Sequence, residues 1–199
     1  DEGYPTRPIQ PYDHAKLPGE KTALEAAAAG PDVVVVRPGW TYGPGDRRTF
    51  KLIRMVVKGP PLMATRGTAR QTPVFIDDLV KGARLAAERG GSGEVYHLAG
   101  AEILTAAEIV RTVAVAAGRR PPRFHRPGFP ARAAAFLLET ACRPIHREPP
   151  LSRSKLSFFL HSKPLSIAKA RRELGFSPGV DFAAGLRLTL DWYRNNGWL

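Results

Sequence analysis

The sequence predicts an α/β fold in which a parallel sheet is covered by helices. Four consecutive β-branched residues, 33–36, show no alternation with polar residues. Such a run is typical of a strand that is buried on both faces. It follows an alanine-rich segment that ends at Gly30 and Pro31, a helix-stop signal. A helix, a short loop and a buried strand form half of a β-α-β unit.

The remaining elements follow in order from local signals. Prolines at positions 5, 8 and 11 make residues 1–11 a loop. Thr105 and Glu108 have the spacing of a capping box, and Asp77 can cap a helix after a strand, with Asp78 as a solvated neighbour. We expect strands at 33–36, 74–76 and 95–98, and helices at 12–29, 48–58, 77–89, 105–118, 131–142, 166–174 and 181–196. A loop precedes the stretch 151–160, which carries Phe158 and Phe159.

The composition is ordinary for a soluble globular protein, with 43% hydrophobic and 24% charged residues among 199. The net charge is +12, from 30 basic and 18 acidic residues. Such an excess can indicate a polyanionic partner. Much of it is arginine scattered through alanine-rich segments, which favours a solvated surface over specific nucleic-acid binding. An anionic small ligand such as a dinucleotide also suits a basic field.

Cysteine usage and hydropathy point to the cytoplasm. The single cysteine, Cys142, allows no disulfide within the chain and fits a reducing compartment. No apolar run is long enough to span a bilayer, and no secretory signal is visible. No His/Cys cluster has metal-ligand spacing, so we predict no metal site.

Tyr12 and Lys16 are the first candidate catalytic residues. Positions i and i+4 share one face of a helix, so both side chains can point into one site. A nearby ammonium group favours the phenolate form of a tyrosine, which can then exchange protons near neutral pH. The same spacing also arises by chance, so the pair alone does not establish catalysis.

The loop after the first strand is the second candidate. Gly and Pro crowd the segment from Arg37 to Asp46, at the carboxyl end of the strand, where open α/β sheets bind ligands. Gly39 permits a close approach of the backbone to a ligand. A plain turn is the alternative interpretation.

Five motifs in register resemble the extended short-chain dehydrogenase/reductase superfamily of NAD-dependent epimerases and dehydratases. The resemblance covers essentially all 199 residues. The motifs are Tyr12-x-x-x-Lys16, Arg37-Pro38-Gly39-x-x-Tyr42-Gly43-Pro44-Gly45-Asp46, residues 74–80 (VFIDDLV), residues 93–100 (GEVYHLAG) and residues 168–178 (AKARRELGFSP), with Trp192 and Tyr193 closing the last helix.

The segments 122–127 and 149–153, with the apolar helix between them, are most similar to the branch of 3β-hydroxysteroid and sterol-4-carboxylate dehydrogenases. Nucleotide-sugar members usually carry an arginine where this chain has Gln71, with Arg70 beside it. That difference favours a hydrophobic substrate over a nucleotide-sugar. A nucleotide-sugar epimerase or dehydratase, and a non-catalytic dinucleotide-binding protein of the same fold, remain alternatives.

The resemblance implies hydride transfer between NAD or NADP and a carbinol or carbonyl carbon. Tyr12 would be the acid/base, and Lys16 would favour its phenolate and bind the nicotinamide ribose. The resemblance implies cofactor contacts by Tyr12, Lys16, Pro38, Gly39, Trp40 and Thr41. It implies substrate contacts by Tyr42, Arg47, Arg70 and Gln71. It also implies a homodimer that acts on a small molecule.

Three parts of the family pattern do not occur in this sequence. They are the Gly-rich phosphate loop, the residue that selects NAD or NADP, and the Ser/Thr before the tyrosine. We therefore expect the C-terminal portion of a longer enzyme, inactive by itself. The expected fold is the C-terminal part of a Rossmann-type parallel sheet with helices, plus a small, mostly helical substrate-binding lobe. Residues 1–100 would form the Rossmann-like part, with a substrate-lobe insertion near 45–72, and residues 101–199 mainly the lobe.

Overall fold

The chain divides into two compact units in a computed structural model that describes residues 1–6, 8, 11–58, 66–121 and 153–199. The helix predicted at 131–142 lies outside the described residues. Unit 1 comprises residues 1–43, 72–102 and 164–185, and unit 2 comprises residues 44–71, 103–163 and 186–199. Residues 164–185 thus belong with unit 1, whereas the sequence-based division predicts that residues 101–199 form mainly the substrate-binding lobe.

Unit 1 contains two pairs of parallel strands. Strand β1 (Val35–Pro38) pairs with β5 (Val95–Leu98), and β2 (Trp40–Tyr42) pairs with β4 (Pro73–Phe75). The predicted parallel arrangement is confirmed, although β1 begins two residues later than predicted. Parallel pairing needs a long crossover between strands, and helix α3 (Ile76–Arg89) lies in the crossover from β4 to β5.

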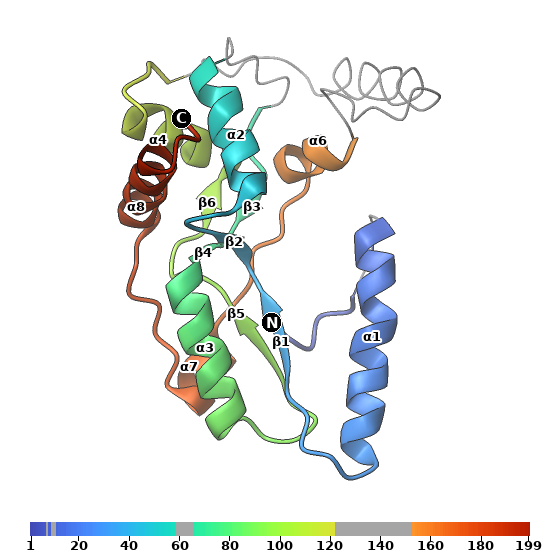
Figure 1. Cartoon of the computed structure of the whole chain (residues 1–199). Coiled ribbons are helices and arrows are strands. Elements are labelled where there is room, and N and C mark those ends of the chain that lie inside the picture. The colour runs from blue at the N-terminus through green and yellow to red at the C-terminus, as the bar shows by residue number, and fades with distance from the viewer. Residues whose placement is uncertain (7, 9–10, 59–65, 122–152) are drawn as a thin grey trace. The chain divides into compact units, whose positions relative to one another are not determined.

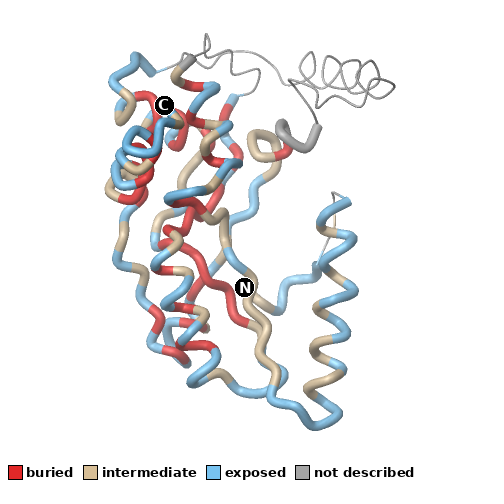
Figure 2. The backbone as a smooth tube through the Cα atoms, in the orientation of Figure 1, coloured by how far each residue is buried: buried red, intermediate tan, exposed pale blue. Residues whose placement is uncertain are grey.

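The core of unit 1 forms between β5 and the helices beside it. Helices α3 and α7 (Ala168–Leu174) pack against β5 and against each other (Figure 1). The fully buried side chains there include Leu98, Leu174 and Phe176. Helix α1 (Pro11–Ala28), in contrast, has no buried residue (Figure 2). Its half-buried residues include Leu17, Glu20 and Leu24.

The two acidic residues at the start of α3 differ from their predicted roles. Phe75 occupies the N-cap position without a side-chain cap, and Asp77 lies inside the first turn, where a carboxylate favours the positive end of the helix. Asp78 is buried instead of solvated. Its carboxylate accepts hydrogen bonds from the backbone N–H groups of Gly179 (3.0 Å) and Val180 (2.9 Å). Asp78 therefore fixes the loop that leads into the last helix.

Unit 2 contains helices α2 (Arg47–Lys58), α4 (Ala106–Ala116) and α6 (Arg153–Leu160), the larger part of α8 (Phe182–Asn195), and a short antiparallel pair of strands, β3 (Arg70–Gln71) and β6 (Leu104–Thr105). Helix α2 packs against α4. The predicted capping box at the start of α4 is confirmed, because the side chains of Thr105 and Glu108 each bond the other's backbone N–H.

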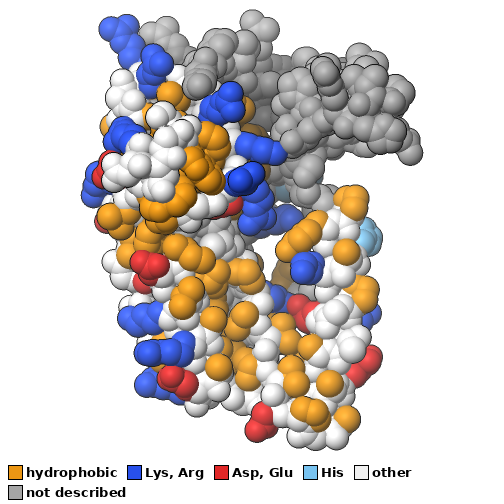
Figure 3. Space-filling model, viewed as in Figure 1, with side chains coloured by type: hydrophobic (Ala, Val, Ile, Leu, Met, Phe, Trp, Pro, Cys, Tyr) orange, Lys and Arg blue, Asp and Glu red, His pale blue; other side chains and the backbone are white. Residues whose placement is uncertain are grey.

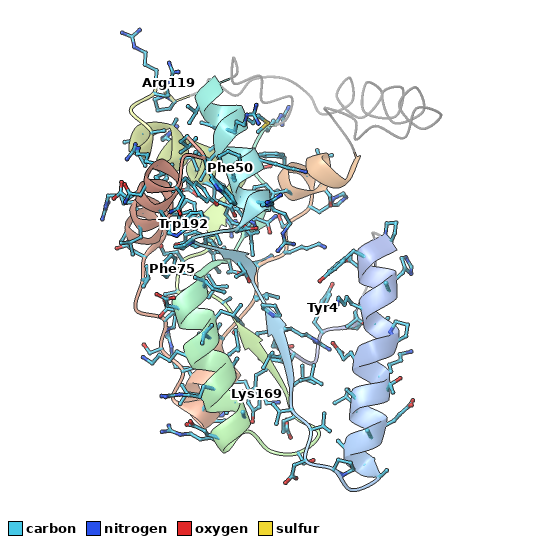
Figure 4. The ribbon with its side chains drawn as sticks, viewed as in Figure 1. Tyr4, Phe50, Phe75, Arg119, Lys169 and Trp192 are labelled. Carbon is cyan, nitrogen blue, oxygen red and sulfur yellow. The ribbon has the colours of Figure 1, made fainter. Side chains whose placement is uncertain are left out.

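Aromatic side chains join the end of the chain to α2. The ring of Trp198 stacks on Tyr193 with 5.3 Å between ring centres and meets Phe50 edge-on at 5.1 Å. The ring centre of Trp192 lies 5.2 Å from that of Trp198. Figure 4 labels Phe50 and Trp192. The hydroxyl of Tyr193 donates to the backbone carbonyl of Asp46 at 2.6 Å. These contacts fix the first turn of α2 within unit 2.

Neither membrane-spanning helices nor metal clusters occur in the part of the chain that the structure describes. No helix there is long and apolar enough to cross a bilayer. The same residues include no group of three or more His, Cys, Asp or Glu side chains placed to hold a metal ion.

Candidate active site

Tyr12 and Lys16 lie together on α1, one turn apart. The Lys16 ammonium nitrogen is 5.6 Å from the centre of the Tyr12 ring, and Tyr12 is 64% exposed. Lys16 is also exposed, as is His14, which lies between the two in sequence. The structure thus brings the predicted pair together with both polar groups accessible to a ligand.

An ion pair anchors α1 to strand β1. The carboxylate of Glu20 accepts two hydrogen bonds from the Arg37 guanidinium, one from Nη2 at 2.6 Å and one from Nε at 3.0 Å. Both side chains are about four-fifths buried. Hydrogen bonding from Arg37 lowers the pKa of Glu20 below its usual range. Two-point Arg–carboxylate contacts fix orientation as well as distance.

This anchor relates the catalytic candidates to the end of β1. Residues 12, 16 and 20 share one helix face, because they are four positions apart. At about 1.5 Å per residue, Lys16 lies about 6 Å and Tyr12 about 12 Å along the axis from Glu20. Helix α1 runs antiparallel to β1, so that direction leads past Arg37 toward the loop that begins at Pro38 (Figure 1). Tyr12 and Lys16 are therefore presented at the carboxyl end of the strand.

The loop after β1 is more regular than the plain turn that we kept as an alternative. Residues 40–42 form strand β2, and the Gly39 N–H donates to the carbonyl of Leu98 at 2.8 Å. A Cβ at Gly39 would collide with the carbonyl oxygen of Thr72 and would lie 3.0 Å from the Cβ of Ala99. Close backbone packing, and not an unusual dihedral angle, is thus what requires glycine at this position.

Replacement of Gly39 by Ala is expected to destabilise the protein by about 1–3 kcal/mol, the usual cost of overpacking a close contact. Urea unfolding of the full-length variant measures the change. Gly19→Ala is the matched control, since nothing lies within 4 Å of its built Cβ and it is inside a helix, where alanine is favoured by about 0.5–1 kcal/mol. Equal stabilities for the two variants would contradict the packing argument.

Tyr42 belongs to the core of unit 1, which corrects its prediction as a substrate contact. It is 1% exposed. The centre of its ring lies 5.9 Å from that of Trp40, 5.7 Å from that of Phe75 and 5.1 Å from that of Phe182. Its hydroxyl donates to the carbonyl of Asp181 at 3.4 Å. Burial raises the pKa of Tyr42, so the phenol stays protonated at neutral pH.

The other cofactor candidates of the loop are only partly buried. Trp40 and Thr41 have intermediate exposure, and Pro38 is exposed. The Thr41 hydroxyl donates to the carbonyl of Gly39 at 3.3 Å. These three residues therefore keep surface that a ligand could contact, and their cofactor role stays a prediction.

The remaining substrate candidates have contacts of their own within unit 2. The Arg47 guanidinium lies 5.8 Å from the centre of the Trp198 ring. Gln71 is buried, and its carboxamide donates to the carbonyls of Phe158 and His161, both at 3.0 Å. The Gln71 amide thus satisfies carbonyls at the end of α6, and only the Arg70 side chain remains exposed from this strand.

Sequence reasoning missed the Glu20–Arg37 pair, although two signals pointed to it. Glu20 continues the four-residue spacing of the catalytic candidates, and Arg37 precedes the loop directly. His97, which we placed near either the substrate or the core, is a core residue at 4% exposure. Its Nδ1 lies 3.8 Å from a Glu2 carboxylate oxygen, and burial lowers its pKa.

The chain is similar to several enzymes of known activity. Residues 1–99 match the model of the NAD dependent epimerase/dehydratase family. A dTDP-glucose 4,6-dehydratase of Streptomyces niveus is 31% identical over 203 residues, covering 98% of this chain and 52% of that protein. A decarboxylating sterol-4-alpha-carboxylate 3-dehydrogenase of Schizosaccharomyces pombe is 26% identical over 193 residues, covering 91% and 56%.

A solved structure agrees with the fold over the whole chain. The dTDP-glucose 4,6-dehydratase of Streptomyces venezuelae, crystallised with NAD, is 26% identical with a TM-score of 0.71, covering 99% of this chain and 55% of that one. The chain therefore spans about half the length of the relatives that it matches. Its motifs, its parallel strands and these matches together show that it belongs to the NAD-dependent epimerase/dehydratase family of the extended short-chain dehydrogenase/reductase superfamily.

Proposed function

We propose that the full-length protein transfers hydride between NAD and a carbinol or carbonyl carbon of a small molecule. The observation that carries this proposal is the accessible Tyr12–Lys16 pair, 5.6 Å from ammonium nitrogen to ring centre, on the helix face that the Glu20–Arg37 pair anchors to β1. Because the chain spans about half of its relatives, the activity is proposed for the protein in its full length.

The chain's own residues supply proton transfer and positioning. Tyr12 would take the proton of a substrate hydroxyl during oxidation and return it during reduction. Lys16 would favour the phenolate through its positive charge and donate hydrogen bonds to the nicotinamide ribose. The partly exposed residues from Pro38 to Thr41 would lie beside the nicotinamide. NAD, when bound, accepts or supplies the hydride.

NAD fits these residues on two observations of the structure. The Tyr12 and Lys16 side chains present accessible donors on one helix face. Pro38, Trp40 and Thr41 keep exposed surface in the segment after β1, where a planar ring could lie. The proposal prefers NAD over NADP because the family model is NAD-dependent and the Streptomyces venezuelae relative was crystallised with NAD.

A hydrophobic alcohol or ketone is the substrate class that we favour. The neutral Gln71 is engaged at the end of α6, so it offers no cation to a diphosphate, and one relative is a sterol-4-alpha-carboxylate 3-dehydrogenase. A nucleotide-sugar is the second candidate. It is supported by the basic charge of the chain and by the dTDP-glucose 4,6-dehydratase among the relatives. We also propose that the full-length protein is a homodimer located in the cytoplasm.

The substrate class is tested by assaying full-length protein with NAD against a panel of steroid alcohols, other hydrophobic secondary alcohols and nucleotide-sugars. Reduced-nicotinamide absorbance reports oxidation, and product analysis reports epimerisation or dehydration, in which NAD is regenerated. We expect turnover with a hydrophobic alcohol. Turnover confined to nucleotide-sugars would establish the second candidate. NAD binding without turnover of any panel member would favour a non-catalytic dinucleotide-binding protein.

A further inference from the structure

The positive charge of the chain is concentrated in unit 2. The sequence ranges of unit 2 hold 20 Lys or Arg and 5 Asp or Glu residues, a net charge of +15. Those of unit 1 hold 10 basic and 13 acidic residues, a net charge of −3. The excess of +12 therefore falls within the sequence ranges of unit 2, whereas we expected arginines scattered along the whole chain. Charge asymmetry of this size between parts of a chain indicates a polyanionic partner.

Helix α2 carries this charge on one continuous face. Arg47, Lys51 and Arg54 follow at spacings of four and three residues, so they form a single stripe, and all three are exposed. The helix contains no acidic residue. Its opposite side is buried through Thr49, Ile53 and Val56. In Figure 3, Lys and Arg side chains gather beside α2.

Exposed aliphatic side chains accompany these cations. Met55 lies beside the α2 stripe and is 47% exposed. Helix α4, which packs against α2, exposes Arg111 and Val115 one turn apart, followed by Arg119. Val115 is 63% exposed. Such a combination of cations and exposed aliphatic groups suits a surface whose outer layer is anionic and whose next layer is apolar.

We propose that the exposed face of α2, with Arg47, Lys51, Arg54 and Met55, binds the surface of an anionic lipid membrane. Each Lys or Arg close to such a surface contributes about 1 kcal/mol of binding, and exposed aliphatic groups add to it by entering the interface. Single-stranded nucleic acid would instead need exposed aromatic rings for base stacking. The aromatic rings of α2 and α8, Phe50, Trp192 and Tyr193, pack against one another and Trp198.

Co-sedimentation of the full-length protein with vesicles tests the proposal. We expect binding to vesicles of mixed phosphatidylglycerol and phosphatidylcholine, weaker binding as salt rises, and none to phosphatidylcholine alone. The double variant Lys51→Gln/Arg54→Gln should lower the affinity about 30-fold, from two cations at the surface. This readout does not use catalysis, so it can fail independently of the proposed activity.

The matched control is Lys81→Gln/Arg84→Gln on α3 in unit 1. Both residues are exposed, and the pair has the same three-residue spacing and the same loss of charge. Its affinity should stay within about two-fold of the wild type, because those cations lie outside the proposed face. If both double variants lost the same vesicle affinity, the effect would depend on net charge alone, which would overturn the proposal. So would the absence of vesicle binding, tighter binding to duplex DNA or RNA, or displacement from vesicles by a nucleoside diphosphate.

Discussion

Tyr12→Phe in the full-length enzyme is expected to lower kcat about 10³-fold, within the range that a positioned acid/base contributes. The variant removes only the hydroxyl, so the ring stays beside the Lys16 ammonium, 5.6 Å from its centre. NAD affinity should therefore stay within about three-fold, because Lys16 and the loop from Pro38 to Thr41 are unchanged. Steady-state kinetics with a substrate found in the panel assay measure the effect on kcat, and NAD titration measures the effect on cofactor affinity.

Tyr4→Phe is the matched control for this experiment. Tyr4 lies in the same unit and is 64% exposed, the same fraction as Tyr12. It should leave kcat unchanged, since it lies outside the shared face of α1. If Tyr12→Phe retained more than about a tenth of the wild-type kcat, a role in general acid/base catalysis would be excluded.

Disruption of the Glu20–Arg37 pair is expected to lower both stability and turnover. Glu20→Gln keeps the shape of the side chain but removes its charge, which should cost about 2 kcal/mol for the charged hydrogen bonds. The pair ties the half-buried side of α1 to β1 and so helps to hold Tyr12 and Lys16 at the end of that strand. We expect kcat to fall about 10-fold or more through misplacement of the reacting groups.

A double-mutant cycle and pH dependence separate this role from a general loss of stability. Glu20→Gln/Arg37→Gln should cost less than the sum of the single variants, because each single change already removes the pair. The pKa of Glu20 is lowered in the folded protein, so its stabilisation is present above the unfolded pKa and is lost as pH falls through the folded one. The stability difference between wild type and Glu20→Gln should therefore shrink at acid pH.

The exposed pair Arg84–Glu88 on α3 is the control for the ion-pair argument. Its side chains are 71% and 51% exposed, and the closest nitrogen and oxygen are 3.5 Å apart. Glu88→Gln should change the free energy of unfolding by less than about 0.5 kcal/mol, as is usual for a solvated pair. An equal effect of Glu20→Gln would show that the Glu20–Arg37 contact is no anchor for α1.

Features that depend on neighbours along the chain could be predicted from the sequence. The run of valines at 33–36 predicted a strand of a parallel sheet, and β1 lies there, shifted by two residues. The predicted burial on both faces is not found, because these valines have intermediate exposure. The capping box at Thr105 needs only residues three apart. The same holds for Tyr12 and Lys16, because the helix period alone places them side by side.

Features that depend on partners far along the chain were decided only by the tertiary structure. The sequence predicts Asp78 to be a solvated residue beside a helix cap. Its carboxylate instead accepts hydrogen bonds from backbone N–H groups 101 and 102 residues away. Gln71 reads as a substrate contact, yet its amide reaches carbonyls 87 and 90 residues away. Tyr42 reads as a ligand-binding loop residue, yet its ring fills the core.

The physical reason is that a polar side chain can be buried only where its hydrogen bonds are satisfied, and the satisfying groups come from whichever segment packs beside it. Helix period, strand patterning and capping depend only on residues that are close together in sequence. The sequence alone therefore determined the parallel α/β fold and the Tyr12–Lys16 pair. The packing of distant segments decided the rest. That packing pairs Glu20 with Arg37 and buries Tyr42 and Gln71. It also assigns the most basic segments of the chain to unit 2.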